Sequence, residues 1–286
     1  MKEKNQVFIL TKDLKKIKYF IKYYNIFNMK TNQVINLIID NRKEKNIFED
    51  DNNFFNSIHY TSDILSKVEH YIDNKEMFYK ILDVYGLSIK LLIFLYCKEI
   101  NINKLMLIDD DLFMLKPFDD YFEKYDYVIK RESLSRMSKD VKDGLSNTFS
   151  KNIICEMDKK ASFINSGTMI FTYKENLKLI EKINLFFNSQ YILNILLKSY
   201  KQNKDKPLRQ IRWRTWCLEQ YVHAIIFNEI NNIGYFKSDV KLLTSPKNSK
   251  HIKKLSRLVH YLPIDKSYFY DEYSKLIDNY ISRNSK

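Results

Sequence analysis

The chain has 286 residues, of which 45% are hydrophobic and 15% aromatic, and its formal net charge at pH 7 is +13. This length fits one large domain or a domain with an extra helical lobe, and only four Gly and four Pro exclude long flexible linkers and low-complexity segments. Three cysteines without metal-ligand spacing, and no visible secretory leader, lead us to expect a reduced, cytoplasmic protein.

The order of the predicted elements indicates an α/β protein. Apolar runs predict strands at 7–11, 34–39, 104–108, 127–129, 233–236 and 258–261. Helical periodicity predicts helices at 14–24, 77–97, 175–200, 215–228 and 266–282, and Pro117 with Asp119-Asp120 predicts the start of a short helix. Residues 163–172 are typical of two strands around a turn, whereas 41–74 give no clear pattern.

Strands that alternate with helices predict a doubly wound, Rossmann-like and mostly parallel sheet flanked by helices. We expect a single domain over residues 1–265, with a variable loop or insert at 131–160 because that stretch lacks clean periodicity. A C-terminal helix or tail at 266–286 follows. The most hydrophobic stretch, 87–97, is far shorter than the ~20 residues of a membrane span.

Three acidic residues, Asp109, Asp110 and Asp111, follow the apolar run 105–108. Because that run predicts a buried strand, the carboxylates lie at its carboxyl end, where open α/β sheets bind ligands. Carboxylates this close repel one another unless a cation offsets them. Asp109 and Asp111 share one side of the extended chain, and two such oxygen ligands suit magnesium or manganese bridging a diphosphate. A solvated acidic turn is the alternative, which the flanking apolar residues disfavour.

Polar residues bordered by apolar runs recur in three later segments. Asn165-Ser166-Gly167 lies between two apolar runs, Glu219 and Gln220 lie near the start of a predicted helix, and His260 follows a strand-like run. Each has a plain structural explanation, namely a turn, the polar face of an amphipathic helix, or a core histidine. His260 is an attractive third metal ligand beside a carboxylate pair, and Lys266 could then neutralise a phosphate.

Together the four segments resemble retaining glycosyltransferases of the GT-A fold, especially glycosyltransferase family 8, which includes galactosyltransferases and glycogenin. That family has Asp-x-Asp after an apolar strand, an Asn-[Ala/Ser]-Gly turn, an Asp-Gln pair on a helix and a His-x5-Lys motif. The matching residues, in the same order, are Asp109 and Asp111, Asn165-Ser166-Gly167, Glu219-Gln220, and His260 with Lys266. The departures are Glu219 in place of Asp, Pro263 in place of Gly, and no Pro-Trp after Lys266.

The resemblance implies a metal-dependent hexosyltransferase that moves a sugar from a nucleotide diphosphate donor, expected to be a UDP-sugar, to a hydroxyl acceptor with retention. It implies a Mn²⁺ or Mg²⁺ site made by Asp109, Asp111 and His260. The residues implied in nucleotide-sugar binding are Thr11, Asp40, Lys90, Asp109, Asp110, Gly167 and Lys266. Gln220 would lie beside the anomeric carbon, Glu219 would be the general base if the enzyme inverts, and Asn165 would contact the donor sugar or the acceptor.

The sequence leaves the acceptor open among a glycan, a lipid-linked glycan and a protein. Basic stretches at 198–214 and 247–257 would suit peripheral docking on an anionic membrane, with simple solvated charge as the alternative. A basic protein that binds nucleic acid or membrane without catalysis would explain the charge but not three carboxylates at a strand end. A sugar-nucleotide pyrophosphorylase normally needs a Gly-rich loop after the first strand, and the first glycine here is Gly86.

Overall fold

A computed structural model describes the chain over residues 5–26, 33–41, 54–114, 116–132, 139–160, 163–173, 178–201, 218–227, 230, 233–237, 240–243, 258–261, 275, 278–279 and 282–283. Its strands are β1 (Asn5–Thr11), β2 (Gln33–Ile39), β3 (Ser57–Tyr60), β4 (Lys104–Asp109), β5 (Leu112–Met114), β6 (Tyr127–Glu132), β7 (Phe163–Thr172), β8 (Ile233–Tyr235), β9 (Val240–Leu243) and β10 (Leu258–Tyr261).

The helices fall into an N-terminal and a C-terminal group. The first group is α1 (Leu14–Ile26), α2 (Thr61–Val68), the 3₁₀-helix η1 (Glu69–Tyr71), α3 (Lys75–Val84), the 3₁₀-helix η2 (Gly86–Ser88), α4 (Ile89–Glu99) and α5 (Asp119–Lys124). The second group is α6 (Lys139–Thr148), α7 (Lys151–Lys160), α8 (Leu179–Phe187), α9 (Gln190–Lys201) and α11 (Leu218–Phe227). Within the described part of the chain, every helix is too short or too polar to cross a bilayer.

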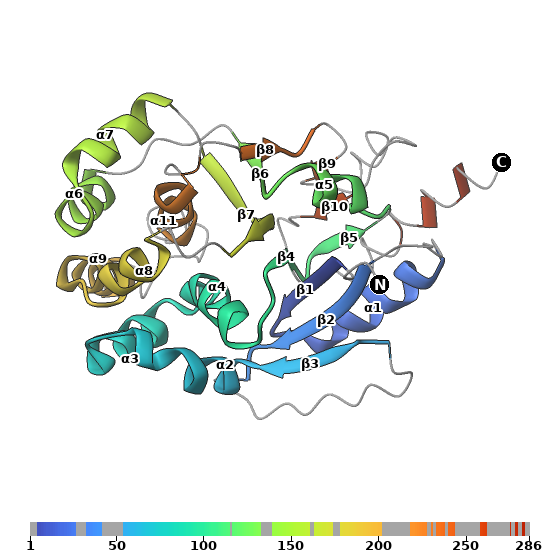
Figure 1. Cartoon of the computed structure of the whole chain (residues 1–286), viewed down its shortest axis with the longest axis horizontal. Helices are drawn as coiled ribbons and strands as arrows, with labels where there is room; N and C mark the ends of the chain where they lie inside the picture. Colours follow the sequence, from blue (N-terminus) through green and yellow to red (C-terminus); the bar gives the residue numbers. More distant parts are fainter. Residues whose placement is uncertain are drawn as a thin grey trace.

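The strands form a seven-stranded sheet in the order β3-β2-β1-β4-β7-β6-β8 and a three-stranded sheet in the order β5-β10-β9. In the large sheet β7 runs antiparallel to both its neighbours, β4 and β6, and the other described pairings are parallel. Figure 1 shows α3, α4, α8, α9 and α11 on one side of this sheet and α1 on the other. The predicted α/β class with a mostly parallel sheet and flanking helices is confirmed.

Alternation of side chains along β4 gives the sheet two buried faces. Leu105 and Leu107 pack into a core with α2, α3, α4, α8, α9 and α11, whereas Met106 and Ile108 pack into a second core with α1 and α5. The same parity holds in β1, where Phe8 belongs to the first core. Because side chains of a strand point alternately to opposite faces, Asp109, the last residue of β4, is directed to the face of the first core.

Some predicted elements differ from the structure. The single helix predicted at 77–97 is broken, because Tyr85 ends α3 with an extended φ of −133° and Gly86, a poor helix former, opens η2. The turn predicted at 165–167 is also wrong, since 163–172 is one strand, β7. The unassigned stretch 41–74 contains β3 and α2.

The loop predicted at 131–160 is wrong over α6 and α7, which are helices. In α6 the buried residues Val141, Gly144 and Leu145 have helical spacing, but the surrounding Lys, Asp and Ser residues conceal it in the sequence. Whether this segment is an insert stays a prediction, as does the division at residue 266, because most of 262–286 lies outside the described residues.

Phe94 of α4 provides a test of the first core. Its ring is 2% exposed and its centroid lies 3.8 Å from that of Phe171 in β7. Phe94→Ala should lower the free energy of unfolding by about 3–5 kcal/mol, because the cavity cannot fully collapse. Equilibrium urea denaturation measures the loss. Tyr191→Ala removes an aromatic ring that is 54% exposed, and should cost less than about 1 kcal/mol. Equal losses would contradict this assignment of the core.

Candidate functional site

The three consecutive carboxylates lie at the carboxyl end of β4, in the middle of the large sheet. In the parallel register of β1 and β4, Asp109 is opposite Leu10. The next residue of β1, Thr11, therefore lies beside Asp110. Asp109, the last residue of β4, falls on the parity of Leu105 and Leu107, the face covered by α4, whereas Asp110 and Asp111 lie in the turn that follows the strand.

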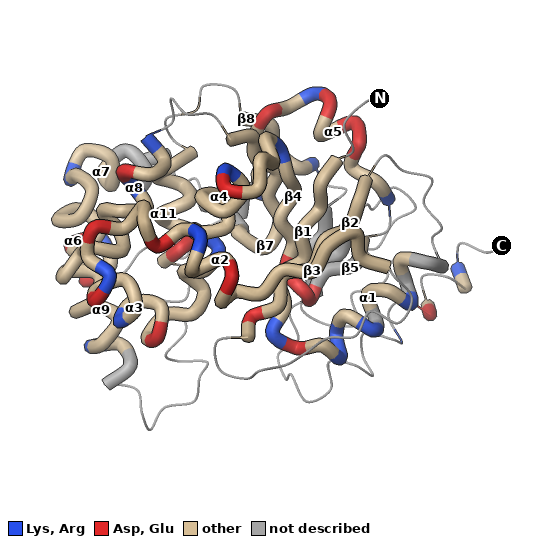
Figure 2. Tube along the Cα trace, turned by 60° about the horizontal axis from the view of Figure 1, so that its bottom comes forward, with Lys and Arg blue, Asp and Glu red and all other residues tan. Residues whose placement is uncertain are grey.

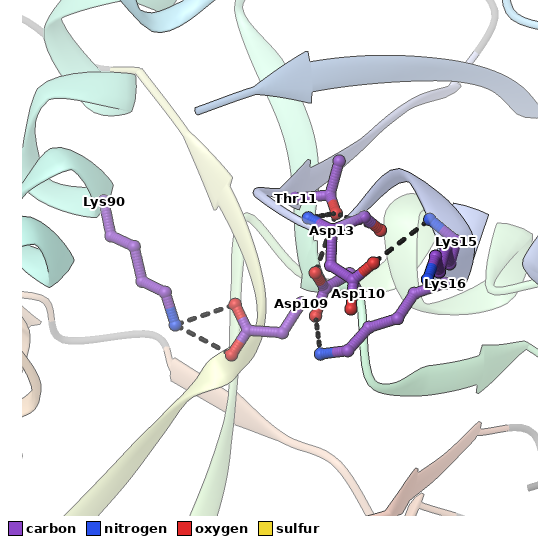
Figure 3. A network of polar contacts seen from close by, with 7 residues as sticks. All are labelled: Thr11, Asp13, Lys15, Lys16, Lys90, Asp109 and Asp110. Carbon is purple, nitrogen blue, oxygen red and sulfur yellow. Dashed lines mark hydrogen bonds and ion pairs between the residues drawn. The ribbon is translucent and has the colours of Figure 1, made fainter. Parts of the chain in front are cut away.

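Asp109 is held by Lys90, which reaches it from α4. The Lys90 Nζ lies 2.7 Å from Asp109 Oδ1 and 2.8 Å from Oδ2, so both carboxylate oxygens contact the ammonium (Figure 3). Lys90 is only 4% exposed, although the other residues around it on α4 are apolar. A lysine buried in this way requires a partner of opposite charge, and the first carboxylate of the cluster supplies it.

Asp110 is held on the opposite face by Thr11 and Lys16. The Thr11 hydroxyl donates to Oδ2 at 2.7 Å, and the Lys16 ammonium donates to Oδ1 at 2.8 Å. Lys16 belongs to α1, which carries basic residues along its length (Figure 2). Burial alone would lower the pKa of Lys16, but Asp110 and Asp111 raise it above its ordinary value. Figure 3 shows Lys90 and Lys16 approaching the cluster from opposite sides.

Asp40 lies next to this end of β1, and its role in nucleotide-sugar binding stays a prediction. Its backbone N–H donates to the Thr11 carbonyl at 2.7 Å, and the Thr61 hydroxyl donates to its carboxylate at 3.3 Å. Thr11, Asp40 and Asp110 are thus neighbours at one edge of the sheet. Thr11 is 1% exposed, and its side chain contacts Asp110.

The small sheet brings the backbone of His260 to the carboxylate cluster. In the antiparallel pairing of β10 with β5, His260 is opposite Leu112, the residue after Asp111. This pairing joins two segments that are far apart in the sequence, and whether His260 is a third ligand stays a prediction. The His260 side chain and all of Lys266 lie outside the described residues.

The segment Asn165-Ser166-Gly167 forms a bulge in β7 that reaches the site. β7 pairs Met169 with Ile129 of β6 but Asn165 with Lys130, so residues 166–168 bulge out of the β6 ladder. Across β4, Thr168 is opposite Ile108, which brings Gly167 to the end of that strand. Ser166 and Gly167 are buried, and the side chain of Asn165 lies outside the described part.

Glu219 and Gln220 lie in the first turn of α11, and their surroundings differ. Glu219 is 0% exposed, and its two carboxylate oxygens accept hydrogen bonds from the Tyr85 hydroxyl and from Ser166 Oγ, the latter at 2.8 Å. Gln220 is only partly buried. Tyr85, Ser166 and Lys16 are site residues that sequence reasoning missed. The motif contained Ser166, but nothing local indicated that its hydroxyl binds a carboxylate.

The charges around Lys90 favour an additional cation. Burial alone would lower the pKa of Lys90, but Asp109, Glu219 and Asp111 raise it above its ordinary value. Burial raises the pKa of Glu219, and Lys90 opposes that effect. One ammonium facing three carboxylates leaves excess negative charge, and these oxygens are the ligands that hard divalent cations prefer. Among residues with described side chains, no three His, Cys, Asp or Glu form a group that could hold a metal.

His223, one turn after Glu219, belongs to the core. Its ring is 0% exposed and lies 5.2 Å from the ring of Phe94, centroid to centroid. Burial lowers the pKa of His223 to about 3, and nearby Lys90 adds to the effect. The imidazole is therefore neutral at physiological pH.

Thr11→Val should destabilise the protein, because it removes a hydroxyl donor from the buried Asp110 carboxylate at almost constant volume. We expect a loss of about 1–3 kcal/mol in the free energy of unfolding, measured by urea denaturation. Thr172→Val is the matched control, since the Thr172 hydroxyl donates to a neutral carbonyl, that of Asp126, at 2.9 Å. Its loss should be about 1 kcal/mol or less. A larger loss in the control would contradict the role given to Thr11.

No model of a known protein family matches the sequence, and no protein of curated function matches it. The structure is similar to that of WbbM, a bifunctional glycosyltransferase, with 10% identity and a TM-score of 0.52 over 96% of this chain and 50% of WbbM, so the chain spans half the length of that protein. Two further structures match. Mouse xyloside xylosyltransferase 1 has 10% identity and a TM-score of 0.44 over 90% of this chain and 96% of its own. The galactosyltransferase LgtC has 10% identity and a TM-score of 0.44 over 96% of this chain and 95% of its own. The chain has the GT-A fold.

Proposed function

We propose that the protein is a metal-dependent glycosyltransferase that moves a sugar from a nucleotide diphosphate donor, a UDP-sugar, to a hydroxyl acceptor. One observation carries the proposal. Asp109, Asp110 and Asp111 lie at the carboxyl end of a central strand of a GT-A fold, and the small sheet brings the backbone of His260 opposite Leu112. In an open α/β sheet this edge is where ligands bind.

Asp109, Asp111 and His260 are the residues that would hold Mn²⁺ or Mg²⁺. Two oxygens and an imidazole are a suitable donor set, and the excess negative charge around Lys90 supports a divalent ion there. When bound, the ion supplies Lewis-acid stabilisation of the negative charge that develops on the leaving diphosphate. Lys90, already fixed at Asp109, and Lys266 would add positive charge for the diphosphate.

The remaining residues would position the donor. Thr11, Asp40 and Asp110 form the edge where the nucleoside would lie, which their mutual contacts support. The bulge at Gly167 allows close approach of the backbone to the end of β4. Asn165, at the start of the bulge, would contact the donor sugar or the acceptor.

Gln220 would lie beside the anomeric carbon, and transfer would proceed with retention. Its partial exposure, in contrast to the burial of Glu219, supports this choice between the two residues. Bound in a fixed pose, the sugar needs only an acceptor hydroxyl held at the anomeric carbon. A glycan or a lipid-linked glycan is the acceptor that we propose, reached by peripheral contact of the basic stretches 198–214 and 247–257 with an anionic membrane; apart from 198–201, these stretches lie outside the described residues.

Asp111→Asn tests the metal site. Mn²⁺ and UDP together should raise the melting temperature of the wild-type protein more than either alone, because both bind the folded state at one site. The variant should lose most of this increase, and its slow hydrolysis of UDP-sugars should fall on the order of 100-fold, because an amide carries no charge to offset the metal. Differential scanning fluorimetry with UDP-, GDP- and CMP-sugars measures the first effect.

Asp120→Asn is the control for this experiment, since Asp120 is an exposed acidic residue of α5. It should retain both metal-dependent stabilisation and hydrolysis. Stabilisation by UDP that is equal with and without Mn²⁺, or equal in wild type and Asp111→Asn, would rule out the proposed metal site.

A further inference from the structure

Three buried polar side chains from distant segments meet at the first turn of α11. They are Tyr85, directly after α3, Ser166 in the β7 bulge, and Glu219 of α11 itself, and each is at most 4% exposed. Burial of polar groups is costly unless each of them is paired. The hydrogen bonds among these three residues therefore indicate what they do.

Glu219 is enclosed by its two neighbours. The Tyr85 hydroxyl donates to one carboxylate oxygen, and Ser166 Oγ donates to the other at 2.8 Å. A general base must reach the proton that it removes. A carboxylate that is 0% exposed and has a donor on each oxygen is poorly placed for that role. Its hydrogen bonds join segments of the protein to one another instead.

Tyr85 holds the first turn of α11 through two hydrogen bonds. Besides donating to the Glu219 carboxylate, its hydroxyl oxygen accepts a hydrogen bond from the backbone N–H of Glu219 at 3.1 Å. The first N–H groups of an α-helix have no carbonyl partner within the helix, so a side chain from elsewhere can cap them. Tyr85 thereby ties the turn that contains Gln220 to the end of α3.

The hydrogen bond between Ser166 and Glu219 joins the two segments that carry Asn165 and Gln220. α11 packs against β7, and the Ser166 hydroxyl reaches Glu219 across this contact. Asn165 precedes Ser166 in the chain and Gln220 follows Glu219. These outer residues are the two that the proposed function places around the reacting sugar. The spacing between their segments is therefore set by one buried contact.

We propose that Glu219 is a positioning residue that fixes the β7 bulge and the first turn of α11 relative to each other. By doing so it holds Asn165 and Gln220 around the sugar, and it exchanges no proton with the substrate. The inference rests on the proposed function, which supplies the roles of these two residues. It adds Tyr85 and Ser166 to the residues on which transfer depends, although neither reaches the sugar.

The kinetics of donor hydrolysis separate positioning from base catalysis. With Mn²⁺ and either UDP-glucose or UDP-galactose, Glu219→Gln, Tyr85→Phe and Ser166→Ala should each lower kcat about tenfold, because the sugar is held less well. KM should change less than about threefold, since the residues that bind the nucleotide are intact. The dependence of kcat on pH should keep its wild-type shape in Glu219→Gln.

A double variant tests whether these residues act as one unit. Tyr85→Phe combined with Glu219→Gln should be about as slow as the slower of the two single variants. Tyr96→Phe is the matched control, because Tyr96 is 3% exposed and its hydroxyl contacts His59 Nδ1 at 2.8 Å, outside this group. It should change kcat less than about twofold.

Three kinetic results would overturn the inference. Loss of an acid limb of the kcat profile in Glu219→Gln would make Glu219 the general base. Wild-type kcat in both Tyr85→Phe and Ser166→Ala would show that the contacts of Glu219 do not matter for the reaction. Losses that multiply in the double variant would show that Tyr85 and Glu219 act independently.

Hydrogen exchange measures the link between the two segments without any substrate. In each of the three single variants, backbone amides of residues 163–168 and of residues 218–221 should exchange at least about fivefold faster, and in Tyr96→Phe they should not. If the wild-type protein neither binds UDP with Mn²⁺ nor hydrolyses a donor, the proposed function fails by itself. Exchange then decides the link, which faster exchange in only one of the two segments would refute.

Discussion

The ion pair between Lys90 and Asp109 is the interaction on which the rest of the site depends. α4 is buried along most of its length and packs on the sheet through apolar residues, and Lys90 is the charge that it carries into that core. A buried ammonium requires a carboxylate partner. Asp109, at the end of β4, provides it. The same ion pair therefore joins α4 to the end of β4 and fixes the position of Asp109 in the site.

The same logic applies on the other face of the sheet. β4 ends at Asp109, and the carboxylate in the turn after it meets α1, where Lys16 and Thr11 hold it. Each helical layer thus contributes one lysine to one carboxylate at the end of β4. Asp111, the second residue of that turn, directly precedes β5 of the small sheet. The end of one strand and the turn after it distribute three like charges among three surroundings.

Features of the site that are encoded locally could be predicted from the sequence. The apolar run before Asp109 predicts a buried strand, and the position of the acidic residues after it predicts the edge at which they lie. The partners of these residues depend on packing between distant segments, which no local pattern reports. Tyr85 and Glu219 are 134 positions apart, and their contact exists only because α3 ends at Tyr85 instead of continuing into α4. The bulge at Ser166 depends likewise on the register between β6 and β7.

The order of these partners along the chain has a consequence for how the site is assembled during synthesis. Thr11, Lys16 and Lys90 all precede the carboxylates that they hold, and β1, β2, β3 and β4 form the parallel half of the large sheet. Once β4 has left the ribosome, the nascent chain already contains the residues of both lysine–aspartate pairs. β7, α11 and His260 emerge later, and they complete an edge at which Asp109 and Asp110 are already paired.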